Sequence, residues 1–349
     1  MTKHKRRRKH RAARRRRSAA VRLSWAVIGT LSVVGTGACL MYAGLNGNID
    51  SVDIDRQLGD DRPRATGNGL SVLVLGSDSR SGDNQAYGRD EGSARSDTAM
   101  VLHLYPGRRS ATVISIPRDT LVDRPVCPTR DGASAPARRR AMFNTAYSVG
   151  GPACTVKTVE SMSGIRMDHF VELDFTGFKK LVDAFGGVPM DIERSVKDKA
   201  SGLDVSAGRH ILDGEQALAL VRTRKAVGDG SDLGRIRLQQ AFITALLRQV
   251  GSIDVLDNPK KAYALADTAT KSLTTDAGLA SVKSLLALAQ SVKAMETKNI
   301  RMLTLPVTPD RKDPNRVVPL EDETAELWQR LRAEREVAPR KEGPRSSPS

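Results

Sequence analysis

Three apolar segments decide the fold: LSVLVL at residues 70–75, AMVLHLY at residues 99–105 and ATVISI at residues 111–116. Each is a nearly continuous apolar run that glycine or proline ends, which is typical of a strand buried on both faces. Pro106 and Gly107 separate the second and third runs. We therefore expect these two strands to pair as a hairpin.

Helix-like segments alternate with further strand-like segments along the chain. Strands are expected at residues 170–175 and 300–307. Thr176 is expected to cap a helix over residues 177–185, and the other helices expected outside the polar clusters cover residues 153–162, 276–295 and 321–335. Such alternation predicts an α/β fold, a three-layer α/β/α sandwich with a mixed central sheet.

The first 45 residues predict a membrane anchor. Residues 1–22 contain twelve Lys and Arg and no acid, and residues 23–45 contain no charge. An apolar stretch of this length spans a bilayer, and the basic flank places the N-terminus in the cytoplasm. The sequence thus predicts a basic cytoplasmic tail (1–22) and a single-pass transmembrane signal anchor (23–45) in the cell membrane. A cleaved signal peptide, a lipoprotein signal ending at Cys39 and a buried helix of a cytosolic protein are the alternatives.

Beyond the anchor, the composition predicts three parts. Residues 46–68 are polar and rich in Gly, Asp and Pro, which favours a short linker. Residues 69–335 are expected to form the extracytoplasmic domain. Residues 336–349 are rich in Pro, Ser and charge, so we expect a disordered tail.

The net charge of +16 does not indicate nucleic-acid binding. Twelve of the 56 basic residues lie in the tail, so residues 23–349 carry 44 basic against 40 acidic side chains. Aromatic residues are only 4% of the chain, too few for base-stacking platforms. We therefore expect the tail to contact anionic lipid heads and the protein to bind no nucleic acid.

Two of the three cysteines, Cys127 and Cys154, lie in the part expected outside the cytoplasm, where disulfides persist. A bridge between them would close a loop of about 28 residues and stabilise the fold by roughly 3–4 kcal/mol. Two unpaired buried thiols are the alternative.

Five polar segments interrupt the apolar pattern: GSDSR at residues 76–80, RSDT at 95–98, PRDT at 117–120, VRTR at 221–224 and DLGRIRLQQ at 232–240. The planar guanidinium of arginine binds phosphate oxygens in pairs. Mg²⁺ binds through one or two carboxylates together with phosphate oxygens. The pattern therefore indicates phosphoryl chemistry on a pyrophosphate-like group, and scattered surface ion pairs are the alternative.

The last two segments carry a local prediction as well. Asp232 is expected to cap a helix over residues 233–250, with Arg235 and Gln239 four residues apart on one face. Arg222 and Arg224 share a face only if their segment is extended rather than helical.

In this order, and together with FNTAYSVGGP at residues 143–152 and GIRMDHFVELDFTGF at residues 164–178, these segments resemble the LytR-CpsA-Psr family of cell-envelope proteins. The resemblance covers residues 71–240. It implies a membrane-anchored phosphotransferase that moves a glycopolymer, such as wall teichoic acid, from a polyprenyl-pyrophosphate carrier to peptidoglycan. The product is a phosphodiester at the muramic acid 6-hydroxyl. The resemblance also implies Mg²⁺, with Mn²⁺ as an alternative, and an apolar pocket for the lipid.

The resemblance implies roles for matched positions. Asp78 and Asp97 would hold the metal. The pyrophosphate would be bound by Arg118, Arg222, Arg224 and Arg235, and the same site would be lined by Arg95, Asp232 and Gln239. Either Asp97 or Asp232 would accept the proton of the sugar hydroxyl. Leu238 and Leu220 depart from the residues that many relatives carry at those positions, and both departures leave the matched Arg and Asp residues in place.

Two other functions use the same residues. A polyprenyl-pyrophosphate hydrolase would use water as the acceptor, and an acceptor assay distinguishes it from a transferase. A non-catalytic regulator of the cell envelope (a transcription attenuator) is the second alternative.

Overall fold

The computed structural model describes residues 35–65, 67–77, 96–223, 232–252 and 258–337, with only the backbone described for Asp97, Asp232 and Leu233. The chain divides into two compact units, residues 1–48 and residues 49–349. In the first unit a helix covers residues 35–47, which overlaps the second half of the anchor expected over residues 23–45. Among the described residues, no helix is long and apolar enough to cross a membrane. Residues 1–34 lie outside the described part of the chain.

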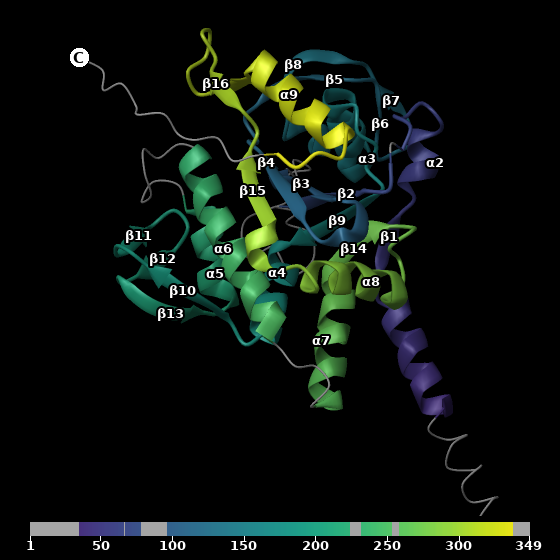
Figure 1. Cartoon of the computed structure of the whole chain (residues 1–349), viewed down its shortest axis with the longest axis vertical. Helices are drawn as coiled ribbons and strands as arrows, with labels where there is room; N and C mark the ends of the chain where they lie inside the picture. The colour runs from purple at the N-terminus through teal and green to yellow at the C-terminus, as the bar shows by residue number, and fades with distance from the viewer. Residues whose placement is uncertain (1–34, 66, 78–95, 224–231, 253–257, 338–349) are drawn as a thin grey trace, which may run out of the picture. The chain divides into compact units, whose positions relative to one another are not determined.

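A seven-stranded mixed sheet forms the centre of the second unit (Figure 1), in the order β1-β14-β9-β2-β3-β4-β15. Its strands are β1 (Asp50–Val52), β2 (Leu70–Ser77), β3 (Ser96–Leu104), β4 (Ala111–Ile116), β9 (His169–Asp174), β14 (Leu273–Asp276) and β15 (Ile300–Thr304). The pairs β1–β14, β9–β2 and β4–β15 are parallel, and the other neighbours are antiparallel. The predicted α/β fold with a mixed sheet is confirmed, as is the β3–β4 hairpin.

Both faces of the sheet are covered, which is why its strands are apolar almost throughout. On one face, Leu73, Val101 and Ile114 are fully buried in a core that includes α3 (Thr145–Ser163) and α9 (Glu321–Arg332). The other face carries Met100 and Val113 and is turned toward α6 (Asp232–Ser252). Because side chains alternate along a strand, neighbouring residues serve opposite layers.

A smaller core lies beside the layer of α6. The helices α4 (Phe175–Ala184) and α5 (Gly214–Arg222) pack against each other, and α5 also contacts α6. Two hairpins complete it: β10 (Val188–Ile192) with β13 (Gly208–Leu212), and β11 (Val196–Asp198) with β12 (Leu203–Val205). Phe242 of α6 is 1% exposed in this core. The helix α7 (Pro259–Ser272) packs on α4, and α8 (Val282–Lys293) contacts α6.

The remaining elements are short. They are α2 (Ile54–Leu58), η2 (Pro106–Arg108), β5 (Leu121–Arg124), β6 (Cys127–Pro128), β7 (Ser134–Ala135), β8 (Arg138–Met142), η3 (Thr297–Asn299), β16 (Val307–Pro309) and β17 (Val317–Pro319). Three antiparallel pairs arise from them: β5 with β8, β6 with β7, and β16 with β17.

The segment expected to be a linker belongs in part to the fold. Residues 50–52 form β1, which pairs with β14, and α2 buries Ile54 and Leu58 in the main core. Arg62 forms a buried ion pair with Glu160 of α3, with its Nη2 2.7 Å from Oε1. A few apolar residues in this otherwise polar segment are enough to pack it against the main core. The residues that they contact lie far away in the sequence. The prediction of a linker over residues 46–68 is therefore wrong for residues 50–58 and for Arg62.

Some expected helix boundaries are also wrong. The cap of α4 is Asp174, whose Oδ1 accepts a hydrogen bond from the Gly177 amide at 2.7 Å, and not Thr176. The helix expected from residue 276 begins only after Ser281, because residues 273–276 pair with β9 as strand β14. At the C-terminus, Val337 is 9% exposed and joins the main core, whereas residues 338–349 of the expected tail lie outside the described part.

The disulfide between Cys127 and Cys154 is present. It joins β6 to α3 over a sequence separation of 27 residues. Both cysteines are buried beside Ala146 and Val149, in a small cluster separate from the main core.

Candidate functional site

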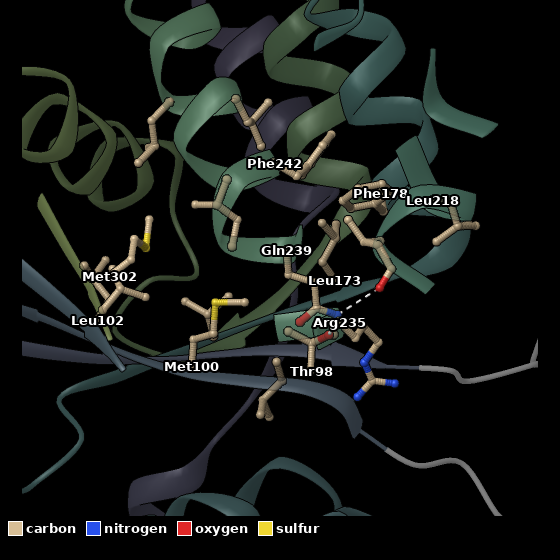
Figure 2. Close-up of a pocket in the computed structure, with 18 of the residues that line it drawn as sticks. Thr98, Met100, Leu102, Leu173, Phe178, Leu218, Arg235, Gln239, Phe242 and Met302 are labelled. Carbon is tan, nitrogen blue, oxygen red and sulfur yellow. Dashed lines mark hydrogen bonds between the residues drawn. The ribbon is translucent and has the colours of Figure 1, made fainter. Parts of the chain in front are cut away.

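An apolar cavity of about 720 Å³ lies between the sheet and α6 (Figure 2). The strands contribute Met100 and Leu102 of β3 and Met302 of β15, and the helices contribute Phe178 of α4 and Phe242 of α6. These strand residues are the alternate positions that do not enter the main core. The cavity therefore exists because one face of the sheet is apolar while the helices above it leave space unfilled.

The cavity has one polar end. Thr98, Arg235 and Gln239 lie there, and Leu102 and Met302 lie well apart from Arg235 (Figure 2). Leu102 lies four positions after Thr98 on β3, a distance of roughly 13 Å in an extended strand. A long apolar chain with a polar head has the shape and polarity that such a cavity accepts.

Two arginines line the polar end. Arg235 lies in the first turn of α6 and is 3% exposed. Arg222 is the last residue of α5, and its guanidinium carbon is 4.8 Å from the centre of the Phe175 ring. The α5 helix ends here because Thr223 is extended, so Arg222 is helical, and Arg224 lies outside the described residues. Arginines held by packing and stacking in this way suit the binding of phosphate oxygens.

Two carboxylates that the sequence did not indicate line the same end, Asp174 and Asp198. Asp174 follows β9 directly and caps α4, and its place in the segment 164–178 was the only available signal. Asp198 is 6% exposed at the end of β11, and no local pattern distinguished it from other acidic residues.

Gln239 lies at the cavity as predicted, but its contacts indicate a different role. Its Nε2 donates to Thr98 Oγ1 at 3.1 Å and to the Val221 carbonyl at 3.0 Å. A primary amide has two N–H groups, so both are already donated within the protein. Gln239 therefore ties α6 to β3 and to the end of α5 rather than donating to an anion, and we treat it as a positioning residue.

Other predicted residues meet at one edge of the sheet. Ser77 at the end of β2 is opposite Ser96 at the start of β3, and Ala99 is opposite Ile116 in the β3–β4 hairpin. Asp97 follows Ser96, and Arg118 lies two residues beyond the end of β4. The topology thus brings the start of β3 and the segment after β4 to the same edge, which sequence spacing alone did not establish.

Arg118 is 18% exposed, and its Nε lies 3.5 Å from Asp119 Oδ2. Asp119 also pairs with Arg316, with Nη1 3.3 Å from Oδ1. The carbonyl of Arg118 accepts a hydrogen bond from the Asn144 amide at 3.1 Å. These contacts fix the backbone and orient the guanidinium, which is largely buried.

Several predicted site residues are not tested by the geometry. Asp78, Arg95 and Arg224 lie outside the described residues. Asp97 lies in β3 and Asp232 begins α6, but their side chains are not described. Among the described residues, no cluster of three or more His, Cys, Asp or Glu side chains could hold a metal ion.

Comparison with known proteins identifies the family. The model of the LytR_cpsA_psr family matches residues 41–333, most of the chain. The chain belongs to the LytR-CpsA-Psr family. The cell wall biosynthesis protein LcpA of Corynebacterium glutamicum is 32% identical over 306 residues, which are 77% of this chain and 58% of that protein.

A relative from Halalkalibacterium halodurans, named polyisoprenyl-teichoic acid–peptidoglycan teichoic acid transferase TagU, is 34% identical over 208 residues, 59% of this chain and 60% of that protein. The chain spans about half to three-fifths of the length of these and similar curated relatives. Members of this family are thus named as cell wall biosynthesis proteins and as teichoic acid transferases.

Solved structures of the family share the fold. The LytR-Csp2A-Psr enzyme from Actinomyces oris matches with a TM-score of 0.60 and 27% identity, covering 81% of this chain and 95% of that one. TagT bound to LI-WTA matches with a TM-score of 0.59 and 26% identity, covering 81% of this chain and 98% of that one.

Proposed function

We propose that this protein is a membrane-anchored phosphotransferase that moves a glycopolymer from a polyprenyl-pyrophosphate carrier to peptidoglycan. The observation that carries the proposal is the long apolar cavity that ends at Arg222 and Arg235. Its apolar length accepts an isoprenoid chain, and its polar end accepts the pyrophosphate. The named activities of the TagU relatives and the LI-WTA bound by TagT support the same class of donor.

In the proposed reaction, the muramic acid 6-hydroxyl oxygen attacks the phosphorus that carries the glycan. The bond from that phosphorus to the bridging oxygen breaks, and polyprenyl phosphate leaves with the electron pair. Asp97 or Asp232 accepts the hydroxyl proton. Arg118, Arg222 and Arg235 stabilise the charge that develops on the phosphate oxygens. Gln239 keeps the helix that carries Arg235 next to β3.

A divalent metal fits the chemistry of the two aspartates that the sequence predicts as its ligands. The residues that would hold Mg²⁺ are Asp78, which follows Ser77 in sequence, and Asp97, which follows Ser96, and these two serines are opposite each other in the β2–β3 pair. A bound Mg²⁺ would neutralise charge on the pyrophosphate oxygens.

The proposal places the domain outside the cytoplasm. The uncharged stretch over residues 23–45 and the basic flank over residues 1–22 support this orientation. Protease treatment of intact cells should digest the domain while leaving a cytosolic marker whole. Protection of the domain until the membrane is opened would contradict the orientation.

The transfer itself is tested with the full chain in detergent. The chain is mixed with a polyprenyl-pyrophosphate-linked glycan, a peptidoglycan fragment and Mg²⁺, and products are followed by mass spectrometry. We expect a glycan–phosphate–peptidoglycan adduct that a chelator abolishes and that Arg118→Ala lowers by about 10²–10³ in rate. Arg139→Ala is the matched control, because that side chain is 93% exposed on β8.

Cleavage of the carrier without an adduct, in the presence of an acceptor, would favour the hydrolase. An Arg118→Ala variant with full transfer activity would remove Arg118 from the site.

A further inference from the structure

A second cavity of about 730 Å³ lies on the opposite face of the sheet from the first. It is polar, and Glu172 and Thr274 contribute to it from β9 and β14. Glu172 and Leu173 are consecutive on β9, so Leu173 lines the first cavity and Glu172 lines the second. The two cavities thus lie on opposite sides of the end of β9, which is paired with the end of β2.

A chain of hydrogen bonds links the second cavity to the end of β2. Tyr147 of α3 donates its hydroxyl to Glu172, and the Ser77 hydroxyl donates to the Tyr147 oxygen at 3.1 Å. Ser77 is the last residue of β2 and directly precedes Asp78. Burial raises the pKa of the Glu172 carboxyl. Burial, and secondly the charge of Glu172, raises the pKa of the Tyr147 hydroxyl. Tyr147 uses its one O–H on Glu172 and so holds that carboxyl in place, and the carboxyl keeps further acceptor positions suited to sugar hydroxyls.

One wall of the cavity carries a cation in a fixed place. The guanidinium carbon of Arg130 lies 5.1 Å from the centre of the Tyr147 ring. The turn that carries Arg130 is closed by the Gly132 amide, which donates to the Thr129 carbonyl at 3.1 Å. Arg130 lies three residues from Cys127, so the disulfide to α3 holds this turn against the helix that carries Tyr147.

Arg130 lies against the backbone of α3. At Gly151, whose φ of +61° favours glycine, a Cβ would be in ordinary van der Waals contact with Arg130 Nε, at 3.5 Å. A second cation, Arg56, also lines the cavity. The nearby Asp53 is used within the protein, since its carboxylate accepts a hydrogen bond from the Arg56 amide at 3.0 Å. The cavity therefore combines hydroxyl-binding groups with cations that suit a carboxylate.

We propose that this second cavity binds the acceptor, a peptidoglycan strand, with Glu172, which Tyr147 holds in place, on its sugar hydroxyls and Arg130 on a carboxylate of its peptide. This inference rests on the proposed transferase function. Donor and acceptor would then approach the reacting phosphate from opposite faces of the sheet, which keeps the lipid and the polymer acceptor from competing for one cavity.

The test measures transfer and binding separately with the full chain in detergent. The acceptor probe is a soluble, uncrosslinked disaccharide–pentapeptide of peptidoglycan. At saturating donor, Arg130→Ala should raise the acceptor KM by about tenfold to a hundredfold, the effect of one lost charge-assisted hydrogen bond, without changing the donor KM. Arg130 is exposed, so its truncation removes no core side chain. Tyr147→Phe, which removes only a hydroxyl, should raise the acceptor KM as well.

Arg139→Ala serves again as the exposed control and should leave both KM values unchanged. Binding is measured separately, by calorimetric titration of the same fragment into the protein without donor. Saturable binding by the wild type that Arg130→Ala weakens would support the cavity, even if no transfer were seen and the transferase proposal failed. Unchanged acceptor KM and affinity in Arg130→Ala, with transfer intact, would overturn the acceptor cavity and leave the transferase. No binding of the fragment by the wild type would also overturn the cavity.

Discussion

Replacing Gln239 by leucine removes the two hydrogen bonds that tie α6 to β3 and α5. They join Nε2 to Thr98 Oγ1 at 3.1 Å and to the Val221 carbonyl at 3.0 Å. Each neutral hydrogen bond contributes about 0.5–1.5 kcal/mol net, so the free energy of unfolding should fall by about 1–3 kcal/mol. For a domain of this size, that lowers Tm by about 2–12 °C.

The variant should also lose activity, because Arg235 lies one turn before Gln239 on the same helix. A misplacement of about 1 Å at a reacting group costs on the order of a hundredfold in rate. We expect kcat/KM for transfer to fall by about tenfold to a hundredfold. Gln239→Glu should behave in the same way, since a carboxylate keeps the length of the side chain but has no N–H to donate.

The neighbouring Gln240 provides the matched control. Its Nε2 donates to the Leu303 carbonyl at 3.0 Å and contacts the hydroxyls of Ser115 and Thr304 at 3.2 and 3.3 Å, away from the first cavity. Gln240→Leu should therefore lower Tm to a similar extent and affect transfer much less. Differential scanning calorimetry and the mass-spectrometric transfer assay give the two readouts. If Gln239→Leu kept the wild-type Tm and still lost transfer, Gln239 would act on the donor directly and the positioning role would be refuted.

Three further predictions follow from single features of the fold. Cys127→Ser should lower the free energy of unfolding by roughly 3–4 kcal/mol in urea titrations, and added reductant should destabilise the wild type but not the variant. Burial by itself would raise the pKa of Asp276. The hydrogen bond and charge of His169, together with two hydrogen bonds from backbone amides, outweigh burial, so the pKa is lowered overall. The carboxylate therefore stabilises the fold above its ordinary pKa of 3.8, and this contribution is lost as pH falls through the lower folded value. Asp276→Asn should lower Tm at pH 7, with a difference from the wild type that shrinks in acid; a constant difference across a pH series would contradict this. Leu102→Gln puts a polar group in the first cavity. Each methylene of a bound chain that is buried there contributes about 0.8 kcal/mol. The substitution should raise the KM of a long-chain donor more than that of a donor truncated near the pyrophosphate, and equal changes would show that the chain binds elsewhere.

Most of the central sheet could be predicted from the sequence because its signals are local. The runs at residues 70–75, 99–105 and 111–116 are apolar and end at glycine or proline, and they form β2, β3 and β4. The strand β14 could not be predicted in this way. Residues 273–276 have no apolar run, and they become a strand because β9, about 100 residues earlier, and β1, more than 200 residues earlier, pair with them on either side.

The sequence also identified the kinds of residue at the first site, because arginine and aspartate clusters at strand ends indicate phosphate chemistry whatever the fold. The sequence did not distinguish residues that could contact a bound molecule from residues that only hold neighbouring elements in place. Gln239 matched a binding position, yet both its amide N–H groups are donated to neighbouring elements. Asp198 gave no signal, because it reaches the cavity through a hairpin whose placement depends on distant packing.

The sequence by itself determined the three central strands and the family motifs, since hydrophobic runs and turn residues act over a few neighbours. Only the tertiary structure decided which segments share an edge or a face. It set Glu172 and Leu173 in different cavities, joined residues 50–58 to the core and brought Arg130 over Tyr147. These relations depend on strand pairing and on packing between residues far apart in the chain, and no local pattern of side chains encodes them.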